Sequence, residues 1–183
     1  MVNLGYNRSV EEDNLQIEAI IKAYLGPVYG FVRRLSGDAF EAEDIAQDVF
    51  LKVWKNLDRY DSKQDFKAWL FAIARNTTID WLRKHRPMLF SSLDQPEGDG
   101  DFVDNLIDEE PLPAELFERA ELAQVLSEAL AQLSLDQRTV ILLHVEQDLT
   151  FEAISQIAGR PLNTVKSQYR RGLITLRQIL APK

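Results

Sequence analysis

The chain has 183 residues, a formal net charge of −8 and 45% hydrophobic residues, a composition typical of a folded protein. It has no cysteine, which excludes disulfides and thiolate metal sites, and no run of about 18 uncharged apolar residues that could span a membrane. Because the N-terminus lacks a basic start followed by an apolar stretch, we expect no secretory signal and a cytoplasmic protein.

The acidic charge is concentrated in one segment. Residues 87–118 contain ten Asp or Glu and no Lys or Arg, so the rest of the chain has 21 basic and 19 acidic residues. Two stretches are basic: 59–86 contains seven Lys or Arg against three Asp, and 160–183 contains six against none. Local patches of this kind indicate phosphate binding better than the overall charge does.

Helical periodicity is present on both sides of a segment rich in Pro, Gly and acids, and no strand alternation or internal repeat is found. We therefore predict an all-α fold of two small helical domains joined by an acidic flexible linker. The predicted division is a tail at 1–13, a helical domain at 14–86, the linker at 87–114 and a second helical domain at 115–183.

In the first domain, residues 15–23 are amphipathic, and Pro27 is expected to break or kink the pattern that follows. A helix is predicted from about residue 41 to 57. Its apolar face is predicted to contain Ile45, Ala46, Val49, Phe50, Val53, Trp54 and Leu57. A polar loop at 60–65 then leads into a long helix at about 66–85.

The opposite side of the 41–57 helix carries Asp44, Gln47, Asp48 and Leu51. The two acids lie early in the helix, where the helix dipole favours negative charge, and this alone could explain them. It does not explain an exposed leucine among them, which favours a contact with a partner protein.

The stretch 66–87 interleaves aromatic and basic residues. A core-facing stripe is predicted at Leu70, Ile73, Ala74, Thr77 and Trp81, with a more polar side at Trp69, Asn76, Asp80, Arg83 and Lys84. Aromatic rings can stack on unpaired bases while basic groups hold phosphates, so this pattern is typical of single-stranded nucleic-acid binding. The alternative, a core role, is favoured for Phe66 and Trp81, and Trp69 fits either role.

In the second domain, helices are predicted near 116–133 and 135–146, followed by a helix–turn–helix. Thr150 is the predicted N-cap of the first helix of the motif, Gly159 its left-handed C-cap, and Asn163 the N-cap of the second helix. Val165, Tyr169, Leu173, Leu176 and Leu180 share its apolar side, and Lys166, Ser167, Arg170, Arg171 and Arg177 the other. The basic side suits a DNA major groove, although a helical hairpin with a solvated basic face has the same spacing.

Catalytic functions find little support. His85 lies in a basic run and His144 in an apolar helix, and the sequence has no phosphate loop, nucleophile motif or metal-ligand spacing. We therefore predict no catalytic residue, no metal and no cofactor.

Two sets of motifs resemble one known family. Residues 44–50 (DIAQDVF), 66–70 (FKAWL), 73–76 (IARN) and 80–83 (DWLR) resemble region 2 of bacterial sigma factors. Leu133-Ser134, Arg138, residues 150–152 (TFE), Ile154 and residues 164–167 (TVKS) resemble region 4. Their order and the intervening acidic linker resemble an extracytoplasmic-function (ECF, group IV) sigma factor of the sigma-70 family.

This resemblance implies a subunit that brings core RNA polymerase to promoters and initiates transcription. It implies partners on the polymerase (the β′ clamp helices and the β flap), promoter DNA in double- and single-stranded form, and an anti-sigma factor as a further partner. The implied polymerase contacts are Asp44, Gln47, Asp48 and Leu51. The implied −10 contacts are Lys63, Asp65, Phe66, Trp69, Arg75, Asn76, Arg83 and Lys84, with Arg86 on the backbone. The implied −35 contacts are Asn163, Thr164, Lys166, Ser167, Arg170 and Arg171.

Three positions depart from the family pattern: Asn163 replaces a glycine, Gln168 an arginine and Ala153 a glutamate. The two promoter elements lie roughly 25 base pairs apart, on the order of 85 Å of B-DNA. A relaxed 28-residue linker spans about 30 Å and a fully extended one about 95 Å. The linker must therefore be held stretched, and we expect the isolated chain to bind promoter DNA far more weakly than the polymerase complex does.

Two alternatives remain at this point. One is a two-domain helix–turn–helix regulator that does not act as a polymerase subunit, which would place a ligand pocket or phosphoacceptor in residues 1–87. The other is a helical adaptor with no role on DNA.

Overall fold

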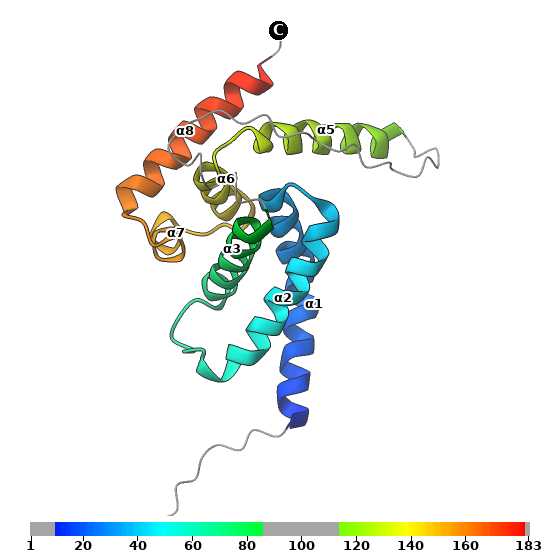
Figure 1. Cartoon of the computed structure of the whole chain (residues 1–183), viewed down its shortest axis with the longest axis vertical. Coiled ribbons are helices and arrows are strands. Elements are labelled where there is room, and N and C mark those ends of the chain that lie inside the picture. The colour runs from blue at the N-terminus through cyan, green and yellow to red at the C-terminus, as the bar shows by residue number, and fades with distance from the viewer. Residues whose placement is uncertain (1–9, 86–113, 182–183) are drawn as a thin grey trace, which may run out of the picture.

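The structure, a computed structural model, describes the backbone of residues 10–85 and 114–181 and the side chains of residues 15–85 and 122–181. All regular structure in these residues is helical, as predicted (Figure 1). The predicted acidic linker lies outside the described residues except for Ala114, which begins a helix. None of the described helices combines the length and the apolar character that a membrane span requires.

Residues 10–85, the described part of the first half, form three α-helices and one short 3-10 turn: α1 (Val10–Ser36), α2 (Ala39–Asn56), η1 (Leu57–Arg59) and α3 (Phe66–His85). The interruption expected at Pro27 does not end the helix, because α1 continues through it. The next turns bury Val28, Phe31 and Leu35 completely. Their burial outweighs the cost of a proline inside a helix, about 3 kcal/mol.

Helix α2 begins at a clear N-cap. The Asp38 side chain accepts hydrogen bonds from the backbone N–H groups of Phe40 (2.9 Å) and Glu41 (3.3 Å). The predicted apolar face is buried except at one residue: Trp54 is 50% exposed. Trp54 lies at the edge of the apolar stripe, where helical spacing alone does not decide whether a side chain faces the core.

The second half contains α5 (Ala114–Ala131), α6 (Leu135–Ile141), a π-helical turn η2 (Leu142–Glu146), α7 (Phe151–Ala158) and α8 (Leu162–Leu180). Helix α6 begins with a capping box, in which Ser134 and Gln137 each accept from the other's backbone N–H at 3.3 Å. The helix predicted at 135–146 is present, but its last five residues form the π turn.

The two halves pack against each other. Helix α1 contacts α5, α6 and η2, and α3 lies between α2 and α7 (Figure 1). The buried apolar side chains of both halves form one continuous cluster, in which Phe31 and Leu35 of the first half join Leu142 and Leu143 of the second. The separate domains expected from the sequence therefore share one core in this structure.

Candidate nucleic-acid and polymerase interfaces

The turn between α7 and α8 has the predicted geometry. The Thr150 side chain accepts from the N–H of Ala153 at 3.2 Å, and Gly159 adopts φ 61° and ψ 34°, the left-handed region that favours glycine. The Ser155 hydroxyl crosses the turn and donates to the backbone carbonyl of Arg160 at 2.7 Å. These contacts fix the direction in which α8 leaves α7.

Helix α8 begins two residues earlier than expected. Its N-cap is Pro161, so the prediction that Asn163 caps it is wrong. Proline lacks an N–H and is suited to the start of a helix, and the carbonyl of Pro161 accepts from the N–H of Val165 at 3.1 Å. Asn163 instead lies exposed in the first turn.

The basic side of α8 is accessible. Lys166, Arg170 and Arg171 are exposed, whereas Thr164 and Ser167 are partly buried. The Ser167 hydroxyl donates to the backbone carbonyl of Thr164 at 2.8 Å. The predicted −35 set therefore lies together on the first three turns of one helix.

The buried side of α8 differs in part from the prediction. Val165 and Leu176 are buried, but Leu173 is 40% and Leu180 44% exposed, so their assignment to the apolar side is wrong. The helix instead packs through Gly172, where a Cβ atom would lie 2.7 Å from Ile141 Cδ1. Leu173, the next residue, lies about 100° further round the helix from Gly172 and faces solvent.

Three aromatic rings gather where the 60–65 loop meets α3. The ring centroids of Tyr60, Phe66 and Trp69 lie 5.0–5.6 Å apart. Phe66 and Trp69 are partly buried, as is Trp81 farther along α3, and all three pack against the core. Phe66 and Trp69, which begin α3 beside the loop, are thus packed against the protein in part and exposed in part.

The polar members of the predicted −10 set lie along α3 and its preceding loop. Lys63, Asp65, Asn76, Arg83 and Lys84 are exposed. Two of the side chains have local roles as well: Asp65 accepts from the N–H of Lys67 at 2.8 Å, and Arg83 pairs with Asp80 at 2.9 Å.

Arg75 differs from the rest of this set. It is partly buried between α3 and the second half of the chain, and one of its terminal nitrogens donates to the side chain of Asn76 at 3.0 Å. Burial lowers its pKa; the carboxylate of Asp136 opposes this shift and the guanidinium of Arg160 adds to it. Arg160 itself lies 3.5 Å from Asp136.

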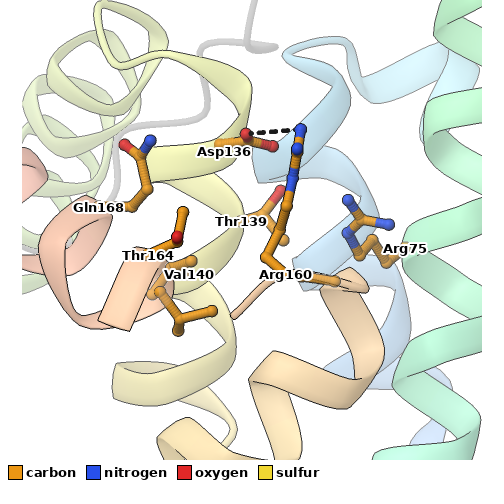
Figure 2. Close-up of a pocket in the computed structure, with 9 residues that line it drawn as sticks. Arg75, Asp136, Thr139, Val140, Arg160, Thr164 and Gln168 are labelled. Carbon is orange, nitrogen blue, oxygen red and sulfur yellow. Dashed lines mark ion pairs between the residues drawn. The ribbon is translucent and has the colours of Figure 1, made fainter. Parts of the chain in front are cut away.

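Arg75 belongs to a small pocket between the two halves, which Figure 2 shows. The other labelled residues in this view come from the second half of the chain: Asp136, Thr139, Val140, Arg160, Thr164 and Gln168. Thr164 and Gln168 belong to the first turns of α8, so a predicted −10 residue and the start of the predicted −35 helix line the same pocket.

The predicted polymerase-binding residues lie together on the solvent side of α2. Asp44, Gln47, Asp48 and Leu51 are all exposed, Leu51 by 50%. Trp54, one turn further along, adds an exposed indole, although helical spacing predicts it on the apolar face. Lys52 of the same helix forms an ion pair with Asp48 at 2.9 Å and donates a hydrogen bond to the hydroxyl of Thr77 in α3 at 3.1 Å.

Comparisons with known proteins agree with the two motif sets. The family model for sigma-70 region 2 matches residues 20–87, and that for sigma-70 region 4 matches residues 123–176. The ECF RNA polymerase sigma factor SigW of Bacillus subtilis (strain 168) is 32% identical over 162 residues, which cover 88% of this chain and 87% of SigW. This chain belongs to the ECF sigma factor family.

Other relatives of this sigma factor agree. The ECF RNA polymerase sigma factor RpoE of Cereibacter sphaeroides is 34% identical over 91% of this chain and 87% of its own length. Among solved structures, the sigma factor RpoE from Bartonella quintana in complex with the anti-sigma factor NepR matches with a TM-score of 0.69 and 26% identity. The match covers 90% of this chain and 96% of that one. A regulator that acts apart from polymerase is therefore not favoured.

Among the described residues of this sigma factor, no three or more His, Cys, Asp and Glu side chains are grouped as a metal site would require. The two histidines are engaged locally. His144 Nδ1 lies 2.8 Å from the carbonyl of Leu149 and its ring stacks on Phe151, while His85 stacks on Trp81 with ring centroids 4.0 Å apart.

Proposed function

We propose that this sigma factor brings core RNA polymerase to promoters by using three surfaces for three tasks. The surface of α8 reads the −35 element as duplex, α3 and its preceding loop hold the −10 element as opened strand, and α2 docks on polymerase. The observation that carries the proposal is the exposed basic face at the start of α8, which follows a helix α7 capped by Thr150 and Gly159.

For the −35 element, the side chains of Asn163, Lys166, Arg170 and Arg171 extend from the start of α8 into solvent, with Thr164 and Ser167 beside them. A helix presented in this way fits the major groove, where its first turns meet base edges and its basic residues meet phosphates. Lys and Arg near the groove contribute both to affinity and to its dependence on salt.

For the −10 element, the partly exposed rings of Phe66 and Trp69 offer stacking surfaces for unpaired bases. Lys63, Arg83 and Lys84 provide positive charge for the backbone of the same strand, and Asp65 and Asn76 provide hydrogen-bonding groups. Stacking contributes about 1–3 kcal/mol per base, so trapping extruded bases shifts the duplex toward its open form without a catalytic step.

For polymerase, the exposed acids and amide of α2 surround Leu51, and this polar rim with an apolar centre is typical of protein interfaces. We assign this surface to the β′ clamp helices, and residues 14–86 and 115–183 to sigma regions 2 and 4. The β flap and an anti-sigma factor complete the proposed partners. The latter is supported by the similar RpoE structure, which contains the anti-sigma factor NepR.

The test is run-off transcription with core polymerase on templates whose upstream sequence is randomised, followed by sequencing of the transcripts. The parent chain is expected to select templates that share two spaced elements. Lys166→Ala, Arg170→Ala and Arg171→Ala combined should reduce transcription from the selected templates by at least tenfold, since each base contact contributes about 1–3 kcal/mol.

The matched control is Arg177→Ala, which removes one exposed arginine from the last turn of the same helix. It should retain most of the activity, and thermal unfolding should confirm that both variants are folded. Unchanged transcription by the triple variant would refute the assignment of α8.

A further inference from the structure

The loop that precedes α3 is tied across by one tyrosine. The Tyr60 hydroxyl donates to the backbone carbonyl of Gln64 at 2.5 Å, so a side chain at one end of the 60–65 loop holds the backbone near the other end. The backbone N–H of Tyr60 donates to the carbonyl of Leu57, a residue buried in the core, at 3.1 Å. The hydroxyl therefore connects the loop to a part of the chain that the core holds in place.

The carbonyl that Tyr60 holds lies between two residues of the proposed −10 set. Gln64 is flanked by Lys63 and Asp65. The N–H of Gln64 donates to the carbonyl of Asp61 at 2.9 Å, and that of Lys63 donates to the Asp61 side chain at 3.0 Å. The Asp65 side chain accepts from two N–H groups in the first turn of α3. The backbone on both sides of Gln64 is thus engaged in hydrogen bonds within the loop and with α3.

The ring of Tyr60 packs against both rings proposed for base stacking. Its centroid lies 5.3 Å from that of Phe66 with an interplanar angle of 88°, and 5.0 Å from that of Trp69 with an angle of 44°. Tyr60 thus contacts the stacking rings through its own ring and the loop backbone through its hydroxyl. The two contacts are chemically separable, because phenylalanine at this position keeps the ring and removes only the hydroxyl.

We propose that Tyr60 is a positioning residue for the −10 element: its hydroxyl holds the 60–65 loop in one form beside the rings of Phe66 and Trp69, so that an extruded base meets groups already in place. The proposal rests on the proposed function, since it takes this loop and these rings as the site of the opened strand. A loop that is ordered before binding loses less conformational freedom when the strand arrives, which strengthens binding without a new contact.

The variant that isolates the hydroxyl is Tyr60→Phe. One hydrogen bond of this kind changes an equilibrium constant by about two- to tenfold. The ratio of ordered to opened loop should fall by that factor in the variant. The affinity of the chain–polymerase complex for opened −10 DNA should fall by up to the same factor.

The first measurement needs no DNA. Hydrogen exchange followed by NMR reports how often a loop opens, and the amides of Lys63 and Gln64 should exchange about two- to tenfold faster in free Tyr60→Phe than in the parent chain. Tyr29→Phe is the matched control, because it removes a tyrosine hydroxyl from α1, outside the loop. It should leave both amides at the parent rate.

The second measurement uses the complex with core polymerase and forked DNA made from templates that run-off transcription has selected. Bases of the opened −10 strand are replaced one at a time by abasic sites. Tyr60→Phe should bind the intact strand about two- to tenfold more weakly than the parent. Both proteins should bind equally at the position whose missing base stacks on Phe66 or Trp69. A hydroxyl with only a structural role would instead weaken binding by the same factor on every strand.

The two measurements together separate this proposal from the proposed function. Faster exchange, with a loss of binding that disappears at one abasic position, supports the role of Tyr60. Unchanged exchange, or equal weakening at every abasic position, would overturn that role even if run-off transcription selects templates. Faster exchange with no selected template would refute the proposed function, and the −10 role of Tyr60 would fall with it.

Discussion

Gly172 lies where α8 crosses α6, and the structure leaves no room there for a side chain. A Cβ atom would meet Ile141 Cδ1 at 2.7 Å and Gln137 Cβ at 3.3 Å. The first contact involves the end of a flexible side chain, which can move, but the second involves an atom fixed by the backbone of α6. A larger residue would therefore push the two helices apart.

We predict that Gly172→Val destabilises the fold by about 1–3 kcal/mol, the usual cost of overpacking, as measured by urea unfolding. Gly26→Ala is the control: it also changes a helical glycine, but apart from its chain neighbours nothing lies within 4 Å of its added Cβ. It should change stability by less than about 1 kcal/mol, because the helix propensity of alanine opposes the crowding of its Cβ against Pro27. Equal loss of stability in both variants would contradict the account of Gly172.

At the scale of single elements, α2 separates its two roles by face. Its buried side holds the first half of the core together, and its exposed side carries Asp48 and Leu51, which we propose as polymerase contacts. Substitutions on the exposed side should therefore change binding and leave stability nearly unaltered.

We predict that Asp48→Ala and Leu51→Ala each weaken binding to core polymerase by about tenfold, as expected for residues that contribute 1–2 kcal/mol to an interface. The measurement is a competition titration against labelled parent chain. Glu18→Ala, which removes an exposed acid from α1, should bind like the parent. If all three variants bind equally, α2 is not the docking surface.

The sequence was informative about elements whose signals are local. The caps at Thr150 and Gly159 and the exposed acids of α2 follow from residue types at fixed helical spacing. The predicted burial is wrong for two residues at the edges of those helical patterns. Trp54 and Leu173 lie at the edges of apolar stripes, where burial depends on how a neighbouring helix approaches.

Contacts between distant parts of the chain could not be predicted in this way. Nothing in the local sequence links Arg34 to Glu146, and Arg75 matches the −10 pattern whether or not it is buried. Gln168 gave no sign that it would line the pocket between the halves. Such pairings depend on the packing of whole helices, which periodicity does not encode.

At the scale of the whole molecule, one core holds both halves, while the proposed function requires the halves to reach separate promoter elements. Among the described residues, one ion pair, Arg34–Glu146, joins the halves beside the apolar packing, and the Nε atom of Arg75 is buried between them without a hydrogen-bond partner.

The central claim is that this chain confers promoter selection on core polymerase. Its most direct test is to purify core polymerase with and without the chain, verify their association by size-exclusion chromatography, and map the 5′ ends of transcripts from the template library. We expect a stable complex and discrete start sites that appear only with the chain. A chain that fails to join core polymerase, or joins it without directing any start site, would contradict the account.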